Sequence, residues 1–428
     1  MKRLIMAAAL LAAACVSAGP SRESLDSIAR DYVKLQLAIG EKEEGYIDAY
    51  YGPAEWQAEA KAGAAAPAAL AQRAGVLAVR LRSLADSRLD RMERRRRDFL
   101  LAQLQAASTR LAMMQGEKLP FAVEAERLFG VRPELKRLSA YDPVLARIER
   151  LVPGKAPLAD RVDAFQERFT IPRQRLEPVM RAAIAECRRR TLEHIPLPAG
   201  ERFTLEFVTG KSWGGYNWYK GGSTSVIQIN TDLPVRIGRA VDLGCHEGYP
   251  GHHVYNMLLE EKLAKGRGWV EFTLYPLYSP QSFIAEGSAN YGIELAFPGD
   301  EQLEFEARTL YPLAGLPAAA APQYLALQRA TRDLAGARFT IAADYLDGRI
   351  SRARAVELTR KYQLYSPERA EKSVAFIDQY RSYVINYGLG LDMVRSSVES
   401  AGPDARSRWA AMEKLLSEPT LPGELTAR

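Results

Sequence analysis

Three of the four histidines in the chain lie within eight consecutive residues, in the segment His246-Glu247-Gly248-Tyr249-Pro250-Gly251-His252-His253. Imidazole nitrogen is a preferred ligand of Zn²⁺. A glutamate directly after the first histidine is the arrangement by which HExxH enzymes place a general base beside the metal. We therefore predict one zinc ion per chain, with His246 as one ligand and Glu247 as the base that takes a proton from water.

The spacing of these histidines differs from HExxH, because the second and third lie six and seven residues after His246 rather than four. On a regular helix, position plus six is rotated by about 120° from His246, and position plus seven lies about 10 Å along the axis. Neither reaches the same ion without a distortion. Pro250 lacks an amide hydrogen, and its ring clashes with the carbonyl of His246. We predict a bulge at Pro250 and Gly251, with His252 as second ligand and His253 as the alternative.

A catalytic zinc ion takes three protein ligands and keeps one position open for water. The segment 282–291 is typical of a helix start, and its Glu286 lies 33 residues after the last histidine of the cluster, enough for a helix, a loop and a return. Glu286 is the predicted third ligand, and Glu294 is the alternative. Cys245 directly precedes His246 and points to a different side of the helix. We expect a small buried residue there rather than a ligand.

The histidine segment, followed by Glu286-Gly287 and Tyr291, resembles the HE-[AG]-x-PGHH and EGWALY motifs of a bacterial domain-of-unknown-function family. That family is regarded as zinc metallopeptidases of the gluzincin clan. The sequence departs from the second motif at two positions, with Ser288 in place of Trp and Asn290 in place of Leu. The resemblance covers about residues 205 to 400, and includes a C-terminal segment that is similar at Tyr387, Gly390 and Arg395.

The resemblance implies a zinc-dependent hydrolase of peptidase type, with a peptide or protein as substrate. In thermolysin-like enzymes an edge strand ahead of the metal helix pairs with the extended substrate. The aromatic residues among the glycines of segment 213–219 lie at a similar place, although packing under a loop would also explain them. By the same analogy, Tyr387 or His253 stabilises the oxyanion that forms during hydrolysis.

Two other functions stay open. One is an envelope lipoprotein that binds zinc without catalysis, and the other is a helical scaffold with a degenerate site, which the departures at Ser288 and Asn290 would allow. A buried polar histidine cluster is a third explanation of the motif. None of these needs a carboxylate at Glu247.

The N-terminus predicts export. A basic start is followed by an apolar run from Leu4 to Ala14 and then by Cys15, as in a secretory signal. The run is too short for a membrane-spanning helix, which takes about 20 residues. Its end resembles a bacterial lipoprotein box, in which Cys15 is acylated after cleavage; ordinary cleavage near Ala14 or Ala18 is the alternative. We predict that residues 1–15 are a signal peptide, and that a lipid anchor on Cys15 holds the protein at the periplasmic side of a bacterial membrane.

The charge of the chain argues against a nucleic-acid partner, and its few cysteines argue against a disulfide framework. The net charge of +6 falls to +4 when Lys2 and Arg3 are removed, and the basic residues are spread among abundant acids, so we expect no nucleic-acid partner. Contact with a membrane is expected through the lipid alone. The remaining cysteines, Cys187 and Cys245, could pair in an oxidising compartment, but two cysteines give no disulfide framework.

The elements that must position the site are mainly helices. From Ser24 to about Ala146, apolar residues recur every three or four positions, which predicts a helix bundle broken at Gly52-Pro53, Ala66-Pro67 and Pro120. A further helix is predicted over residues 176–195. Alternating apolar residues predict strands at 203–208 and 225–230.

The fold class that follows is mainly α, a helical gluzincin-like metallopeptidase with a small β-sheet beside the active-site helix. We expect an N-terminal helical region over residues 22–200 and a catalytic region over residues 201–428.

Overall fold

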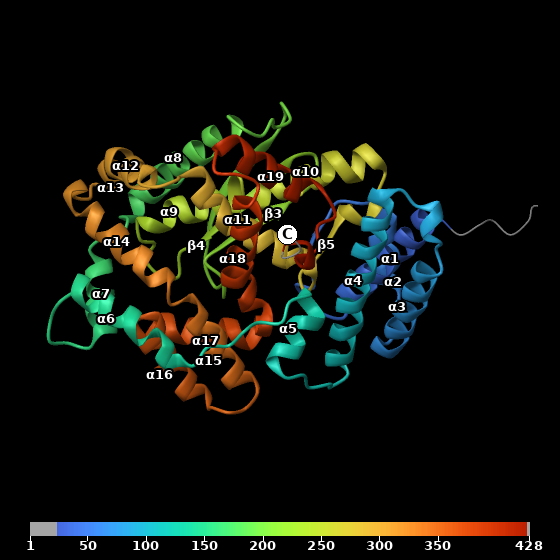
Figure 1. Cartoon of the computed structure of the whole chain (residues 1–428), viewed down its shortest axis with the longest axis horizontal. Helices are drawn as coiled ribbons and strands as arrows, with labels where there is room; N and C mark the ends of the chain where they lie inside the picture. Colours follow the sequence, from blue (N-terminus) through green and yellow to red (C-terminus); the bar gives the residue numbers. More distant parts are fainter. Residues whose placement is uncertain (1–23, 426–428) are drawn as a thin grey trace, which may run out of the picture.

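The computed structural model describes residues 24–425. The predicted signal peptide and Cys15 lie outside the described residues. Figure 1 shows helices throughout the molecule and only short strands near its centre, so the predicted mainly α class with a small sheet is confirmed. Among the described helices, none has both the length and the apolar character that crossing a membrane requires.

The first part of the chain forms the predicted helix bundle at one end of the molecule (Figure 1). Its helices are α1 (Leu25–Gly40), α2 (Ala54–Ala62), α3 (Pro67–Arg82), α4 (Arg91–Met114) and α5 (Phe121–Phe129). Ser24 caps α1 by accepting a hydrogen bond from the Ser27 amide at 3.1 Å. The predicted breaks are confirmed, because α2 follows Pro53, α3 begins at Pro67 and α5 follows Pro120.

Three further helices lead to the sheet: α6 (Asp142–Leu151), α7 (Leu158–Glu167) and α8 (Arg173–Leu192). The last of these is the helix predicted over 176–195, displaced by three residues. It begins directly after Pro172, which ends the preceding extended segment.

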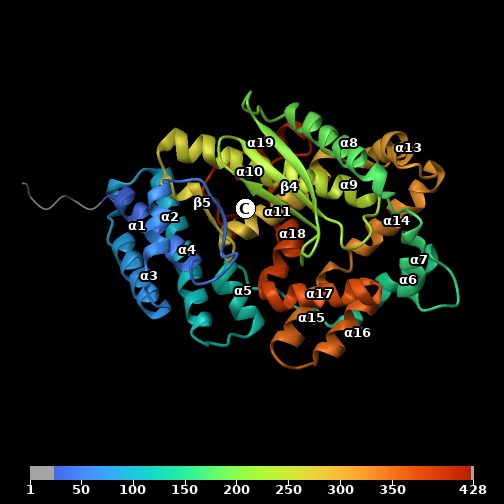
Figure 2. The same ribbon diagram turned by 180° about the vertical axis from the view of Figure 1, so that it is seen from behind.

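Within residues 24–425, five strands form two small sheets. In the first, β2 (Arg202–Val208) lies parallel to β4 (Thr224–Asn230), and β3 (Gly215–Tyr219) pairs antiparallel with β4 at the edge. The two strands predicted from alternation are therefore confirmed. In the second sheet, β1 (Ile47–Tyr50) pairs with β5 (Leu274–Pro276). Figure 2 shows β4 in front of α10 and α11, so the larger sheet covers the central helices.

The central helices are α9 (Gly238–Leu243), α10 (His252–Leu259), α11 (Pro280–Ala296) and α18 (Ile385–Glu399), with π-helical turns η3 (Gly244–Gly248) and η4 (Glu260–Lys265) beside α10. Helices α11 and α18 cross with their backbones in contact. A Cβ atom on Gly287 would lie 2.6 Å from the backbone of Gly390, so position 287 requires glycine, and one on Gly390 would lie a tight 3.1 Å from the Phe283 carbonyl oxygen. This close approach brings the tyrosines before Gly390 next to Glu286.

The rest of the C-terminal part is helical and surrounds this centre. It comprises α12 (Glu301–Phe305), η6 (Glu306–Leu310), α13 (Tyr311–Ala314), α14 (Ala321–Arg332), α15 (Ala335–Leu346), α16 (Arg352–Gln363), α17 (Pro367–Tyr380), η8 (Arg381–Val384) and α19 (Ala405–Ser417). Short 3₁₀ turns complete it at η1 (Asp86–Arg88), η2 (Leu138–Tyr141), η5 (Val270–Thr273), η7 (Ala318–Ala320) and η9 (Pro422–Leu425).

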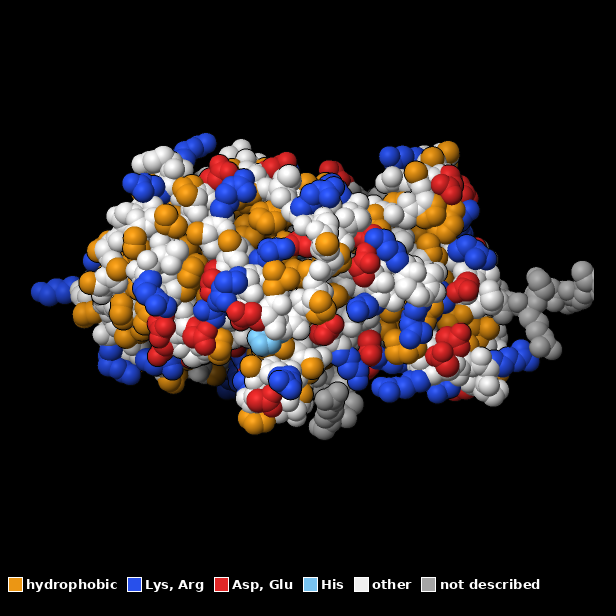
Figure 3. All heavy atoms as spheres, turned by 90° about the horizontal axis from the view of Figure 1, so that it is seen from above, with side chains coloured by type: hydrophobic (Ala, Val, Ile, Leu, Met, Phe, Trp, Pro, Cys, Tyr) orange, Lys and Arg blue, Asp and Glu red, His pale blue; other side chains and the backbone are white. Residues whose placement is uncertain are grey.

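The two predicted regions share one hydrophobic core that runs from Leu25 to Leu425. A buried ion pair also joins them, since Arg96 of α4 donates to Glu271 of η5, with 2.9 Å between Nη2 and Oε2. On the face shown in Figure 3, basic and acidic side chains are interspersed. A division of the chain near residue 200 stays a prediction.

Candidate metal centre

His246, His252 and Glu286 converge on one point. They lie on η3, at the first residue of α10 and on α11, and one ligand atom of each lies within 4.8 Å of the others. The Nε2 atoms of the two histidines are 3.1 Å apart. Nε2 of His246 lies 3.2 Å from Glu286 Oε2, and Nε2 of His252 lies 3.6 Å from Glu286 Oε1. The structure thus brings together the three residues that the sequence predicts as metal ligands.

The chain reaches this arrangement through a break rather than a bulge. The π-helical turn η3 ends at Gly248, Tyr249 is extended with φ −130° and ψ 121°, and a new helix begins at His252. The looped segment is residues 249–251, one residue longer than predicted. Gly251 donates its amide to the Cys245 carbonyl at 3.0 Å, which holds the start of α10 against the end of η3. His252 therefore faces His246 from a separate helix.

The donor set fits a divalent cation. Oε1 of Glu286 accepts a hydrogen bond from the Tyr383 hydroxyl at 2.8 Å, whereas the buried Oε2 accepts no well-aligned hydrogen bond from the described residues and lies 3.2 Å from Nε2 of His246. A buried carboxylate oxygen in this position is costly unless a cation or proton donor satisfies it. Two imidazoles and one carboxylate are the His₂Glu set of a catalytic zinc site. Burial alone would raise the pKa of Glu286, but His252 and His246 hold it well below its usual range.

Glu247 lies beside this group and outside the ligand set. Its side chain is buried against the start of β3, where a Cβ atom on Gly215 would lie 2.8 Å from Oε1 of Glu247. Its backbone carbonyl accepts a hydrogen bond from Nδ2 of Asn217 at 2.6 Å. Burial raises the pKa of Glu247, and the nearby histidines oppose that shift. A buried carboxylate next to a metal group has the placement that a general base requires.

Two tyrosines of the C-terminal helices border the site. The Tyr387 ring stacks on His246, with centroids 6.3 Å apart and planes at 17°. Tyr383, four residues earlier, donates to Glu286 and was not predicted. Burial raises the pKa of both phenols, so each stays protonated and can donate a hydrogen bond. Asn290, a departure from the family motif, donates to the Tyr387 carbonyl at 3.3 Å and joins α11 to α18.

His253 lies outside the metal group, so its predicted role at the oxyanion requires correction. Its Nδ1 lies 2.7 Å from Ser225 Oγ, and its Nε2 lies 3.2 Å from Glu201 Oε2. The ring is fully buried and both nitrogens are engaged. The reason is geometric: as the second residue of α10, His253 points about 100° away from His252 and toward the sheet.

A hydrogen-bond chain links His253 to the backbone of Glu247. Ser225 donates its hydroxyl to Oδ1 of Asn217 at 3.1 Å, and the amide of Asn217 binds the Glu247 carbonyl. Burial alone would raise the pKa of Glu201 at the far end of the chain. Hydrogen bonds from His253 and two further donors lower it to about 2. This chain of hydrogen bonds fixes the position of the Glu247 backbone.

Glu294, the alternative third ligand, lies outside the group of metal-ligating side chains and pairs with an arginine. It accepts two hydrogen bonds from Arg395, at 2.9 and 2.8 Å. Arg395 belongs to the C-terminal segment that resembles the family, and its role in this chain is an ion pair between α11 and α18.

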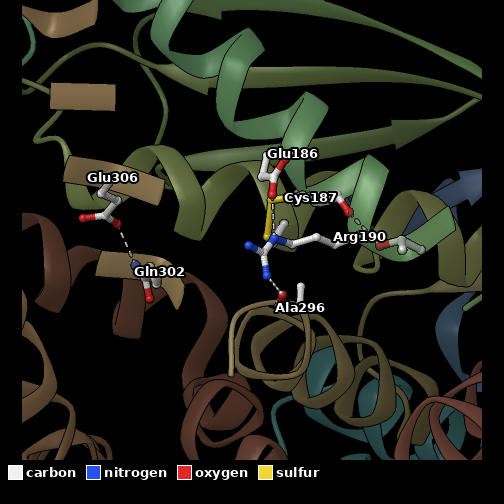
Figure 4. The surroundings of a disulfide bond; sticks show 8 residues. Glu186, Cys187, Arg190, Ala296, Gln302 and Glu306 are labelled. Atoms are coloured by element: carbon white, nitrogen blue, oxygen red, sulfur yellow. Dashed lines mark hydrogen bonds and ion pairs between the residues drawn. A yellow bond between two sulfur atoms is a disulfide. The ribbon is translucent and has the colours of Figure 1, made fainter. Parts of the chain in front are cut away.

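Cys245 is buried as expected, but it forms a disulfide with Cys187, with Cα atoms 5.4 Å apart. Figure 4 shows the bond between α8 and η3, beside Glu186 and Arg190. The disulfide therefore fixes the residue that directly precedes His246 to a long helix of the N-terminal part. Pairing of these cysteines agrees with an oxidising compartment.

Within the aromatic segment 213–219, residues Gly215–Tyr219 form the edge strand β3, and Trp213 lies in the bend before it. Gly215 and Asn217 face η3, while Trp213 and Tyr216 stack on each other with centroids 5.3 Å apart. Tyr216 also donates a short hydrogen bond to Asp48 of β1. The strand therefore runs past Glu247. Tyr219 lies on the same face as Asn217, where it contacts His253 and Glu260, whereas Tyr216 lies on the other face.

Comparison with known proteins gives a likeness of fold. No family model and no curated protein matches the sequence. A solved structure of a candidate lipoprotein from Colwellia psychrerythraea is similar at 16% identity and a TM-score of 0.50, over 80% of this chain and 66% of that one. This chain therefore spans about two thirds of the length of that protein. The structure of an M32 carboxypeptidase from Deinococcus radiodurans R1 aligns at 14% identity and a TM-score of 0.41, over 94% of this chain and 92% of that one, a likeness too low to bear on function.

Proposed function

We propose that the protein is a zinc-dependent peptidase in which His246, His252 and Glu286 hold the metal and Glu247 is the general base. One observation carries this proposal: two imidazole Nε2 atoms and a buried, incompletely satisfied carboxylate converge on one point, next to a second buried carboxylate outside the set. A structural zinc site would have no use for that second carboxylate. The proposal also agrees with the resemblance of the motifs to the gluzincin-type family.

A zinc ion held there would supply a Lewis acid that polarises the scissile carbonyl and lowers the pKa of water. Glu247 accepts the proton of the attacking water and passes it to the leaving nitrogen. Tyr383 fixes the Glu286 carboxylate by its hydrogen bond. The Tyr387 ring stacks on His246, and its hydroxyl is a hydrogen-bond donor that we assign to the oxyanion.

The substrate would be an extended peptide. Strand β3 is the edge of its sheet and passes beside Glu247, so its free backbone groups are placed to pair with a further strand. This pairing would hold the scissile bond at a fixed distance from the base. Because this pairing uses only backbone groups, residues outside β3 would select the side chains of the substrate.

Export and lipid anchoring remain part of the proposal. The sequence around Cys15 and the fold shared with a candidate lipoprotein support them. A Cys15→Ser change should release soluble protein or leave the uncleaved precursor, which fractionation and mass spectrometry of the N-terminal peptide would detect. Unchanged membrane association without a lipid on that peptide would contradict the anchor.

The function is tested by incubating a defined peptide library with zinc-loaded protein and reading the products by mass spectrometry. The matched control is Glu247→Gln, which keeps the ligands and removes the base. We expect new termini only with the unaltered protein. Absence of cleavage in both samples, with zinc bound in both, would favour the alternative of an envelope lipoprotein that binds zinc without catalysis.

A further inference from the structure

Arg239 lies close enough to the candidate site to contact a bound substrate. It lies on α9, seven residues before His246, and its guanidinium reaches the loop that enters β3. A Cβ atom on Gly214 would lie 3.4 Å from Nη2 of Arg239, and one on the next residue, Gly215, would lie 2.8 Å from Oε1 of Glu247. The cation and the catalytic carboxylate therefore border two consecutive residues at the entry to β3, and each acts electrostatically on the other.

The guanidinium is available to a ligand. Asp242, one turn further on the same helix, forms a short ion pair with Nη1, and 49% of the Arg239 side chain is exposed to solvent. Protein also surrounds part of the group, and this burial lowers the pKa of Arg239, while Tyr365 and Glu247 oppose that shift. Arginine stays charged in proteins and presents five N–H donors in a fork. Among the described residues the ion pair to Asp242 uses Nη1, which leaves Nε and Nη2 to meet two acceptor oxygens.

A planar carboxylate is the ligand that this fork matches. In an extended peptide, the carboxylate that lies one residue beyond a scissile carbonyl is the free C-terminus. Acidic side chains branch off the strand instead of continuing it. The carboxylate of Asp48, which is near His252 and Glu286, would suit an N-terminal amine, but it already accepts a hydrogen bond from Tyr216.

We propose that Arg239 binds the C-terminal carboxylate of the substrate, so that the protein removes single residues from free C-termini. The inference rests on the proposed peptidase function and names its substrate class. Hydrolysis adds water across the last peptide bond, leaving a carboxylate on the shortened peptide and an amine on the released amino acid. Glu247 carries the proton from the water to that amine.

Binding can be separated from turnover. In a Glu247→Gln background, titration calorimetry would compare one N-acetylated peptide pool with a free C-terminus and the same pool as C-terminal amides. We expect the free acids to bind about 10- to 100-fold more tightly, the range of a charge-assisted contact, and Arg239→Gln to abolish this difference. Arg181→Gln is the matched control, because Arg181 is also half-exposed and paired within its helix, to Glu177 at 2.8 Å. That variant should keep the preference.

The turnover experiment uses the same pools with the zinc-loaded protein of otherwise unaltered sequence. Release of single C-terminal residues from the free acids, and slow or absent cleavage of the amides, is the expected result. Equal cleavage of acids and amides, a preference retained in Arg239→Gln, or cleavage only beside acidic side chains would overturn the assignment while leaving a peptidase. A third pool with free N-termini is run alongside, and cleavage of that pool alone would overturn the assignment in the same way. Failure to cleave any peptide would count against the proposed function itself. In that case the binding comparison would still show whether Arg239 recognises a C-terminal carboxylate.

Discussion

Gly251 is the residue whose enlargement should damage the metal centre most selectively. A Cβ atom on Gly251 would lie 2.5 Å from the Cys245 carbonyl oxygen and closer still to that of His246. Real Cβ atoms essentially never approach within 3.0 Å, so the segments on either side must separate by at least 0.5 Å. A bound metal ion tolerates a deviation of about 0.2 Å from its ideal metal–ligand distances. Gly251→Ala should therefore move His252 out of range of an ion held by His246.

We expect the zinc affinity of Gly251→Ala to fall by about 10- to 100-fold or more, the effect of disturbing the support of a ligand. Overpacking of this buried segment should also lower the free energy of unfolding by about 1 to 3 kcal/mol. Competition with a chromophoric chelator measures the first quantity, and urea denaturation of the zinc-free protein measures the second.

The matched control is Gly248→Ala, in the same buried segment. A Cβ atom there would make ordinary contacts with side chains at 3.7 and 3.8 Å, so zinc affinity should change little. If Gly251→Ala bound zinc as tightly as Gly248→Ala did, the break at residues 249–251 would not be what sets the distance between the two histidines.

Four further predictions follow from the same geometry. Glu247→Gln should retain one zinc per chain by elemental analysis and lose about 10²-fold or more in kcat, because the carboxylate is a base and not a ligand; retained turnover would reassign the base. His252→Ala should lose the metal whereas His253→Ala should keep it, and the reverse result in elemental analysis would show that the wrong histidine was chosen. Because hydrogen bonds lower the pKa of Glu201 to about 2, below about 4.3 in an unfolded chain, its stabilisation is present at neutral pH and lost as pH falls from about 4 to about 2. Glu201→Gln should therefore flatten urea-denaturation stability over that window, and an unchanged slope would contradict the assignment. Reduction of the disulfide, whose cysteines are 58 residues apart, should cost about 4 kcal/mol by loop entropy, measured by denaturation with and without reductant; a negligible change would mean that the reduced chain is constrained in other ways.

The ligands could be predicted because the sequence restricts them severely. A chain with four histidines, three of them adjacent to a glutamate and a proline, leaves few ways to build a His₂Glu site. The choice of His252 over His253 rested on Pro250, which prevents a continuous helix, and the structure places His252 with His246. Helix starts after proline and the alternating strands were also local signals.

Other features depend on tertiary contacts that no local pattern reveals. Strand β3 contains Gly215 and is bracketed by further glycines, which disfavour strands, and it forms because β4 pairs with it and Gly215 admits the Glu247 side chain. His253 was assigned to the wrong environment because Glu201, its partner, lies 52 residues away in the sequence. Tyr383 reaches Glu286 only because two glycines let α11 and α18 touch. Its spacing of four residues from Tyr387 was the one available signal.

One zinc ion at His246, His252 and Glu286 is proposed to make this protein a hydrolase. Titrating zinc into metal-free protein while following cleavage of the peptide library tests this role most directly. We expect the cleavage rate to rise linearly, to reach its plateau at one zinc per chain, and to stay at baseline throughout the same titration of His246→Ala. Full activity in the metal-free protein, or an equal response of His246→Ala, would contradict it.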